Sequence, residues 1–219
     1  MNAEWSQLNK TMQLQLKKKE TFDSGIETIL ILRRSLMEQI SEFRNTLTAE
    51  DFSAMPFMNA NGYHNKTVAY SLYHVFRIED IVANTLISKT PQLFFSGNYQ
   101  VRMNSPIITT GNELIKQEIA DFSAKLDIDG LYNYIYDVDN STAKLLKRLV
   151  FSDMKTSMTE QDRENVRSLK VVSENENAVW LIDYWCSKNI KGLLQMPFSR
   201  HWIMHTEAAL RIANKLTAK

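Results

Sequence analysis

Apolar residues recur every three or four positions through several long segments of this sequence, a spacing that is typical of amphipathic helices. The clearest segment runs from about Asp23 to about Arg44, where Ile26, Ile29 and Ile40 share one face. Stretches of strict apolar–polar alternation, which would indicate strands, are too short to demand a sheet. The same periodicity predicts further long helices over about 67–87, 130–150 and 198–216, and shorter ones over 112–126, 160–170 and 173–188.

Capping and turn signals divide these helices. Thr48 with Asp51 and Thr159 with Asp162 have the spacing of capping boxes, in which each side chain accepts a hydrogen bond from the backbone N–H of the other residue. Segment 93–108 contains glycine, proline and two adjacent phenylalanines. We therefore expect an irregular connection there that lies over the core.

Composition supports a single all-α domain over residues 1–219, organised as a helical bundle. Only 6 Gly and 4 Pro interrupt the chain, and 44% of its residues are apolar, which is enough to form a core. Residues 1–20 are polar and include the run Lys17–Lys19, so we expect a polar lead-in, either a solvated helix face or a frayed end. We interpret the segment from about 151 to 188 as extra short helices inserted before the last helix.

The charge balance and the absence of apolar runs limit the expected partners. With 26 basic and 25 acidic residues the net charge is +1, which does not favour general nucleic-acid binding, because phosphate affinity depends on Lys and Arg. No signal-peptide pattern is visible, and no segment approaches the roughly 18 apolar residues of a membrane span. Cys186 is the single cysteine, which excludes an intramolecular disulfide. We expect a soluble cytoplasmic protein with no nucleic-acid or membrane partner.

Three of the four histidines fall on helix stripes that should face the core. His201 and His205 lie four residues apart on the last helix, so both imidazoles share one face, and that stripe continues through apolar residues. His74 shares a stripe with Ile78 and Ile81 on the helix over 67–87. Three neutral imidazoles with one open position are a ligand set of catalytic zinc sites, and helical bundles often hold metals in their cores. We therefore predict that His74, His201 and His205 bind a divalent metal ion.

The alternative is that each histidine is an ordinary buried residue, but the i, i+4 pair and the third histidine on a second stripe favour the metal site. His64 falls in the Asn-rich loop 59–65, and we expect it to be exposed and outside the site. A zincin protease is excluded, because Trp202 stands where those enzymes need a glutamate. Zinc and nickel are the metals we expect, although three imidazoles also suit iron and copper.

Two segments carry a resemblance to a known family. Thr67–Asp80, with the sequence TVAYSLYHVFRIED, resembles the second-helix motif of the DinB/YfiT-like superfamily, and HWIMH at 201–205 is similar to the histidine pair on its last helix. The resemblance implies a four-helix bundle in up-down-down-up order, with a metal at one end held by His74, His201 and His205. It also implies an activity like those of the family's metal-dependent thiol S-transferases and thiol-dependent isomerases, which use bacillithiol, mycothiol or similar thiols.

Two departures from the family pattern leave the histidine triad intact and the substrate open. Thr206-Glu207-Ala208-Ala209 follows the pair, where some members have a further histidine and an Arg-Gly-Gln run. The segment between His74 and His201 is also longer than usual, in agreement with an insertion.

Candidate catalytic residues lie near the first predicted ligand. Tyr70 stands one turn before His74 and could reach an open coordination position, and Glu79 follows it on the same helix. The alternatives are core packing for Tyr70, and pairing with Arg77 or solvent for Glu79. A carboxylate is expected to hold the outer nitrogen of a ligand histidine, but the sequence does not identify it.

Two functions from different classes follow. The first is a metal-dependent thiol S-transferase or hydrolase, with a small-molecule substrate and, for the transferase, a low-molecular-weight thiol as co-substrate. The second is a non-catalytic helical interaction protein, able to form a homodimer, whose histidine cluster is vestigial or structural. A role in DNA-damage regulation, suggested only by the family name, has no support from the charge balance.

Overall fold

The computed structural model describes residues 2–218, and within that range the chain is helical, with one isolated backbone bridge between Ser157 and Asn189 and no strand. This confirms the predicted all-α class. No helix of the described range is both long and apolar enough to cross a membrane. The four long helical segments are α2 (Phe22–Thr46), α4 (Val68–Asp80) with its π-helical continuation Ile81–Ser88, α8 (Ile128–Arg148) and α12 (His201–Thr217).

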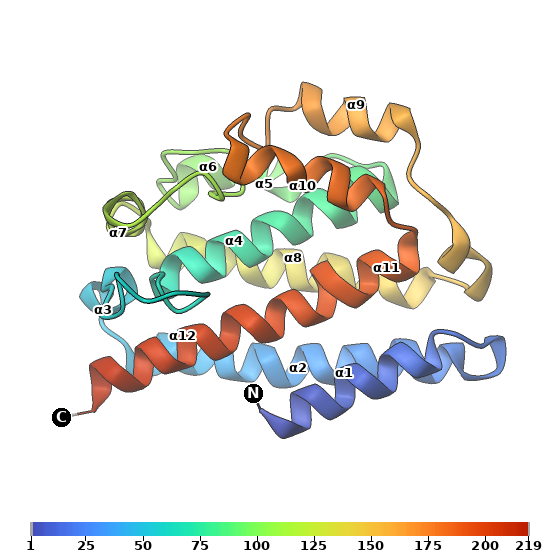
Figure 1. Ribbon diagram of the computed structural model, residues 1–219, viewed down its shortest axis with the longest axis horizontal. Helices are drawn as coiled ribbons and strands as arrows, with labels where there is room; N and C mark the ends of the chain where they lie inside the picture. The colour runs from blue at the N-terminus through green and yellow to red at the C-terminus, as the bar shows by residue number, and fades with distance from the viewer. Residues whose placement is uncertain (1, 219) are drawn as a thin grey trace.

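These long helices pack side by side in two directions (Figure 1). In that view α2 and α12 run toward the left, whereas α4 and α8 run toward the right. Helix α4 contacts both α8 and α12, and α12 also contacts α2. The two elements that carry the histidines, α4 and α12, are therefore antiparallel neighbours, although they lie far apart in the sequence.

Shorter helices connect and cover the long ones. The predicted helix over 112–126 is shorter than expected, because Lys116 has a φ of 45° that a right-handed helix cannot include. Both predicted capping boxes are present, at Thr48 and at Thr159. The short helices are α1 (Ala3–Gln15), α3 (Ala49–Ser53), α5 (Leu93–Ser96), α6 (Tyr99–Arg102), α7 (Gln117–Ser123), α9 (Glu160–Ser168), α10 (Glu176–Cys186) and α11 (Ile190–Gln195).

Within the expected polar lead-in, residues 3–15 form a packed helix. Helix α1 lies along α2 (Figure 1) and buries Trp5, Met12 and Leu16 against the core. The indole N–H of Trp5 donates a hydrogen bond to Ser35 Oγ at 2.9 Å. The run Lys17–Lys19 is exposed where the chain turns back toward α2, as its charge predicts.

The predicted insertion also packs onto the core. Helix α10 buries its apolar residues Leu181, Ile182 and Trp185 in the same cluster as Ile78 of α4. Helix α9 contacts both α10 and the π-helical turns after α4. This segment is therefore part of the domain, and α10 lies beside α4, the helix that carries His74 (Figure 1).

A buried ion pair joins the four long helices. Arg33 of α2 donates two hydrogen bonds to Glu79 of α4, at 2.8 and 2.7 Å, and a third to Asp139 of α8 at 2.6 Å. The indole N–H of Trp202 on α12 donates to the same Glu79 carboxylate at 2.6 Å. Arg33 and Glu79 are 2% and 0% exposed, and Glu79 depends on Arg33 for its countercharge, whereas Arg33 also pairs with Asp139. The expectation that Glu79 pairs with Arg77 or solvent is wrong, because its partner comes from α2.

We expect Arg33→Met to lower the free energy of unfolding by about 3–5 kcal/mol, because it leaves the Glu79 carboxylate buried without its countercharge. Urea denaturation followed by circular dichroism measures this. The matched control is Arg44→Met, which removes a pair with Asp129 whose partners are 41% and 78% exposed. That substitution should cost less than about 1 kcal/mol. Equal losses in the two variants would show that the buried pair does not hold the helices together.

Candidate metal centre

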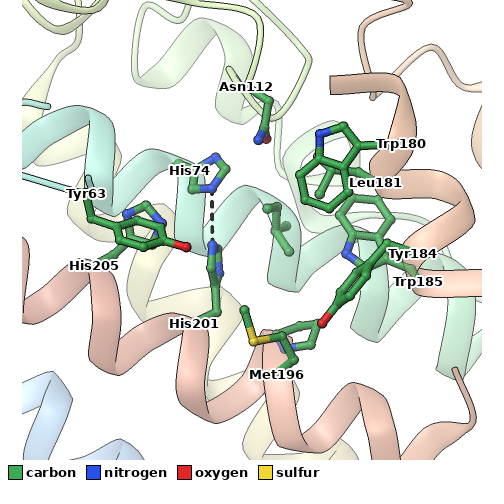
Figure 2. Close-up of a pocket in the computed structure, with 12 residues that line it drawn as sticks. Tyr63, His74, Asn112, Trp180, Leu181, Tyr184, Trp185, Met196, His201 and His205 are labelled. Atoms are coloured by element: carbon green, nitrogen blue, oxygen red, sulfur yellow. Dashed lines mark hydrogen bonds between the residues drawn. The ribbon is translucent and has the colours of Figure 1, made fainter. Parts of the chain in front are cut away.

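Three histidines converge between α4 and α12 (Figure 2). His74 projects from α4, and His201 and His205 project from the first two turns of α12. All three are buried, their ring centroids lie 4.6–5.0 Å apart, and one nitrogen from each lies within 4.8 Å of the others. The structure therefore brings together the three residues that the helical stripes select.

Local sequence places both helices. Thr67 caps the first turn of α4, because its hydroxyl accepts a hydrogen bond from the Tyr70 backbone N–H at 3.0 Å. On the other side, the π-helical segment Met196–Arg200 leads directly into α12 and contains Pro197. Proline has no N–H to donate within a helix, and a π-helical turn holds one residue more than an α-helical turn. His201, the first residue of α12, follows this wider turn directly.

The hydrogen bond of His74 fixes which of its nitrogens is available. Its Nδ1 lies 2.9 Å from the backbone oxygen of Thr110, and a carbonyl oxygen only accepts, so Nδ1 carries the proton. The Nε2 lone pair then points at His201, whose Nε2 is 3.2 Å away. Two nitrogens on one tetrahedral zinc ion lie about 3.3–3.4 Å apart, given Zn–N bonds of about 2.0–2.1 Å. His74 and His201 therefore fit a shared metal ion.

The other two histidines present nitrogens that lack partners. Nδ1 of His201 and Nδ1 of His205 are buried and have no hydrogen-bond partner among residues 2–218. Because His201 offers Nε2 to the shared ion, its Nδ1 is the outer nitrogen of the ring and needs a separate partner, such as an ordered water. The carboxylate expected behind a ligand histidine is not seen at His74, because the Thr110 carbonyl takes that position. A backbone oxygen can orient a ligand imidazole as a carboxylate does.

Burial keeps the cluster neutral. It lowers the pKa of His74 to about 4. The hydrogen bond that His74 donates to the Thr110 carbonyl opposes this shift, and Lys66 lowers the pKa further. Burial, followed by the neighbouring histidines, lowers the pKa of His201 and His205 well below the ordinary value. All three imidazoles are therefore uncharged at neutral pH, which is the protonation state that binds a metal.

The structure reassigns both candidate catalytic residues. The Tyr70 ring stacks on His74, with centroids 5.6 Å apart and planes within 7°, and its hydroxyl donates to the Gly111 carbonyl at 3.0 Å. Burial raises the pKa of that hydroxyl. Glu79 is held by Arg33 and Trp202 on another face of α4, and burial raises the pKa of its carboxyl while Arg33 opposes this. Tyr70 thus orients His74, Glu79 holds the helices in register, and neither lines the pocket described next.

A pocket of about 260 Å³ opens beside the histidines. Figure 2 shows the imidazoles on one side and aromatic side chains of α10 on the other. Several lining residues were not predicted from the sequence, because they come from loops or from a helix whose position depends on the tertiary fold. The lining residues are Tyr63, His74, Ile78, Asn112, Trp180, Leu181, Tyr184, Trp185, Met196, Pro197, His201 and His205.

Tyr63 is the principal residue that the sequence does not reveal. It lies in the predicted Asn-rich loop, its ring meets His205 edge to face with centroids 5.0 Å apart, and its hydroxyl points toward the histidines (Figure 2). The neighbouring His64 lies outside the cluster, as expected, but it is half-buried against Phe57 rather than exposed. The loop therefore contributes a tyrosine, not a histidine, to the site.

Comparisons with known proteins support the fold alone. No protein-family model matches the sequence, and no curated protein matches it. A solved structure described as the conserved protein of locus from Enterococcus faecalis is similar, with a TM-score of 0.59 and 14% identity, over 85% of this chain and 93% of that one. At that identity the likeness shows a shared helical arrangement. The resemblance to the DinB/YfiT-like superfamily stays a prediction.

We expect the metal-free protein to take up one equivalent of zinc in equilibrium dialysis. His74→Ala and His201→Ala should each weaken zinc binding by more than about 100-fold, because losing a ligand costs more than losing the group that orients it. His64→Ala is the matched control and should leave zinc binding unchanged, since His64 lies outside the cluster. Zinc uptake that all three variants retain would contradict the assigned ligands.

The lowered pKa values also predict an acid-sensitive metal-free protein. The unfolded chain binds histidine protons near pH 6.5, whereas the folded chain does not, so the free energy of unfolding falls as the pH falls below about 6.5. Between pH 7.5 and pH 5 each such histidine should cost about 2 kcal/mol. Urea denaturation in the presence of a chelator should show His201→Gln losing about that much less than the wild type. Equal losses would mean that the cluster is protonated without penalty.

Proposed function

We propose that this protein is a metal-dependent enzyme that uses a divalent ion held by His74, His201 and His205 to direct water or a low-molecular-weight thiol against a small electrophilic substrate. It would act as a hydrolase or as a thiol S-transferase. The observation that carries the proposal is the opening of three buried, neutral imidazoles onto a pocket large enough for a small molecule.

The helix directions agree with the family that the sequence resembles. We propose that α2, α4, α8 and α12 are the four helices of a DinB/YfiT-like bundle in up-down-down-up order. The shared direction of α2 and α12, opposite to that of α4 and α8, supports this order (Figure 1). The cluster of histidines between α4 and α12 supports the family's ligand arrangement.

The donor set favours a zinc- or nickel-type ion. Three imidazoles suit these metals, whereas magnesium and calcium prefer oxygen ligands, and no carboxylate is found among the described residues that line the pocket. When bound, such an ion lowers the pKa of water toward about 7 or stabilises a thiol as its thiolate. With three protein ligands, one position stays available to the nucleophile or substrate.

The described residues that line the pocket lack the side chains that most often act as nucleophiles. None of the described lining residues is a serine, threonine, cysteine, lysine or carboxylate. Cys186 does not line the pocket, and burial raises the pKa of its thiol. The nucleophile is therefore expected to come from solvent or from a separate thiol. For this reason we propose two reaction types, hydrolysis and thiol transfer.

Side chains around the cluster have separate roles. Tyr70 and the Thr110 carbonyl hold His74 in one orientation through stacking and a hydrogen bond. Tyr63, whose hydroxyl points at the histidines in Figure 2, is the candidate proton donor to a leaving group. Asn112 places its side-chain amide at the pocket rim in the same view, where it could donate to a substrate carbonyl.

The second candidate is a non-catalytic helical interaction protein. Adjacent apolar residues Val179 and Trp180 of α10, which are 44% and 50% exposed, favour it. In that case the histidine cluster would be structural, and zinc binding would raise stability without producing turnover.

We expect the zinc- or nickel-loaded protein to hydrolyse 4-nitrophenyl acetate, or to join a thiol such as cysteine to 1-chloro-2,4-dinitrobenzene, faster than the free metal does. Tyr63→Phe should leave these two rates nearly unchanged, because 4-nitrophenolate and chloride depart without a proton. It should lower the hydrolysis of ethyl acetate, whose alkoxide needs a proton, at least about tenfold while metal content stays constant. His201→Ala should remove both metal and turnover. Fully loaded protein with neither reaction above background would contradict the enzyme and favour the interaction protein.

A further inference from the structure

The pocket has two chemically different walls. The histidines form one, and α10 forms the other with Trp180, Leu181, Tyr184 and Trp185 (Figure 2). These four positions repeat with the helical period, so they share one face of α10. Three of the four are aromatic, so this wall presents flat apolar rings across the pocket from the predicted metal ligands.

The Trp180 side chain is held by contacts within α10 although it is exposed to solvent. Half of its surface is exposed, yet its indole N–H donates to the Asn177 carbonyl at 3.0 Å and its ring meets Tyr184 edge to face at 5.8 Å. Trp185, in contrast, is 1% exposed and belongs to the core. A large aromatic ring that is held in place at a pocket and left open offers preformed area for a ligand.

The pocket volume limits the size of the ligand. A cavity of about 150 Å³ accepts a benzene molecule. A pocket of about 260 Å³ therefore holds one aromatic ring together with a small reactive group. Larger parts of a ligand or of a thiol co-substrate would remain outside the opening.

The charged groups near the pocket limit the class of ligand further. No acidic residue is among the described lining residues. Basic groups act on both walls: Lys66 acts on His74 and His205, and Arg200 acts on Tyr184. These two charges disfavour a cationic ligand, whereas they do not repel an uncharged or anionic one.

We propose that the pocket selects small aromatic substrates, uncharged or anionic, whose ring lies against Trp180 and Tyr184 while the reactive polar end faces the three histidines. Trp180 is the specificity-determining residue. This proposal rests on the proposed function, since it names the substrate class of the same site. It also assigns a role to the inserted segment over about 151–188, because α10 supplies the selective wall.

The test compares two hydroxamates on the zinc-loaded full-length chain by isothermal titration calorimetry. Benzohydroxamate should bind about tenfold or more tightly than acetohydroxamate, which has the same metal-binding end and no ring. Trp180→Ala should remove most of this difference, Trp180→Phe should keep part of it, and neither should change acetohydroxamate or zinc affinity. A 4-(aminomethyl) derivative of benzohydroxamate, which is cationic, should bind more weakly than the parent compound.

The matched control is Val179→Ala, which truncates the neighbouring exposed residue of α10 that does not line the pocket. It should leave both affinities unchanged. Equal binding of the two hydroxamates, or an equal effect of Trp180→Ala and Val179→Ala, would overturn the aromatic specificity while the metal centre stands.

Failure of zinc to bind would overturn the proposed function and leave the aromatic wall open to a direct test. Fluorine NMR of 4-fluorobenzoate with the metal-free chain then decides it. Line broadening that Trp180→Ala removes and Val179→Ala keeps supports the aromatic wall. No broadening with the wild type overturns it.

Discussion

The charged pair between Arg33 and Glu79 determines how the four long helices meet. Both side chains are almost fully buried, where an unpaired charge is very costly, so α2 and α4 must pack in the register that pairs them. Asp139 brings α8 to the same guanidinium, and Trp202 brings α12 to the same carboxylate. The Arg33 guanidinium also lies over the Trp202 ring, 4.1 Å from its centroid. Since Trp202 directly follows His201, the contact that orders the helices also fixes the face of α12 that carries the histidines.

One physical condition, burial, gives the histidine cluster its chemistry. Removal from water keeps the three imidazoles uncharged and leaves their lone pairs available, whereas exposed histidines would be partly protonated below pH 7. The same burial makes the metal-free cluster expensive, because two ring nitrogens have no partner among the residues that the structure describes. A bound ion would take Nε2 of His201, so the outer Nδ1 would still need its own partner, and the pocket would give substrate access to the ion. In this account α4 and α12 hold the metal, and α10 on the other side of the pocket selects the substrate.

Helix stripes and caps in the sequence predict the long helices, both capping boxes and the inward position of His74, His201 and His205, because each depends on residues within a few turns of one another. The partner of Glu79 could not be predicted, since Arg33 lies 46 residues away and only the packing of α2 on α4 joins them. Tyr63 belongs to a loop, where no periodicity indicates the direction of a side chain. The packing of helix α1 on the core could not be predicted, because its few apolar residues are spaced widely among polar ones and their burial depends on α2.

The X-ray absorption spectrum of the zinc-loaded protein tests the metal centre most directly. We expect three imidazole ligands at about 2.0–2.1 Å and one oxygen ligand from water. An added thiol should replace that oxygen with sulfur at about 2.3 Å. That result would establish both the ligand set and the open position on which the proposed chemistry depends. A spectrum with one imidazole or none, or a closed coordination shell that a thiol does not enter, would contradict a catalytic metal site at His74, His201 and His205.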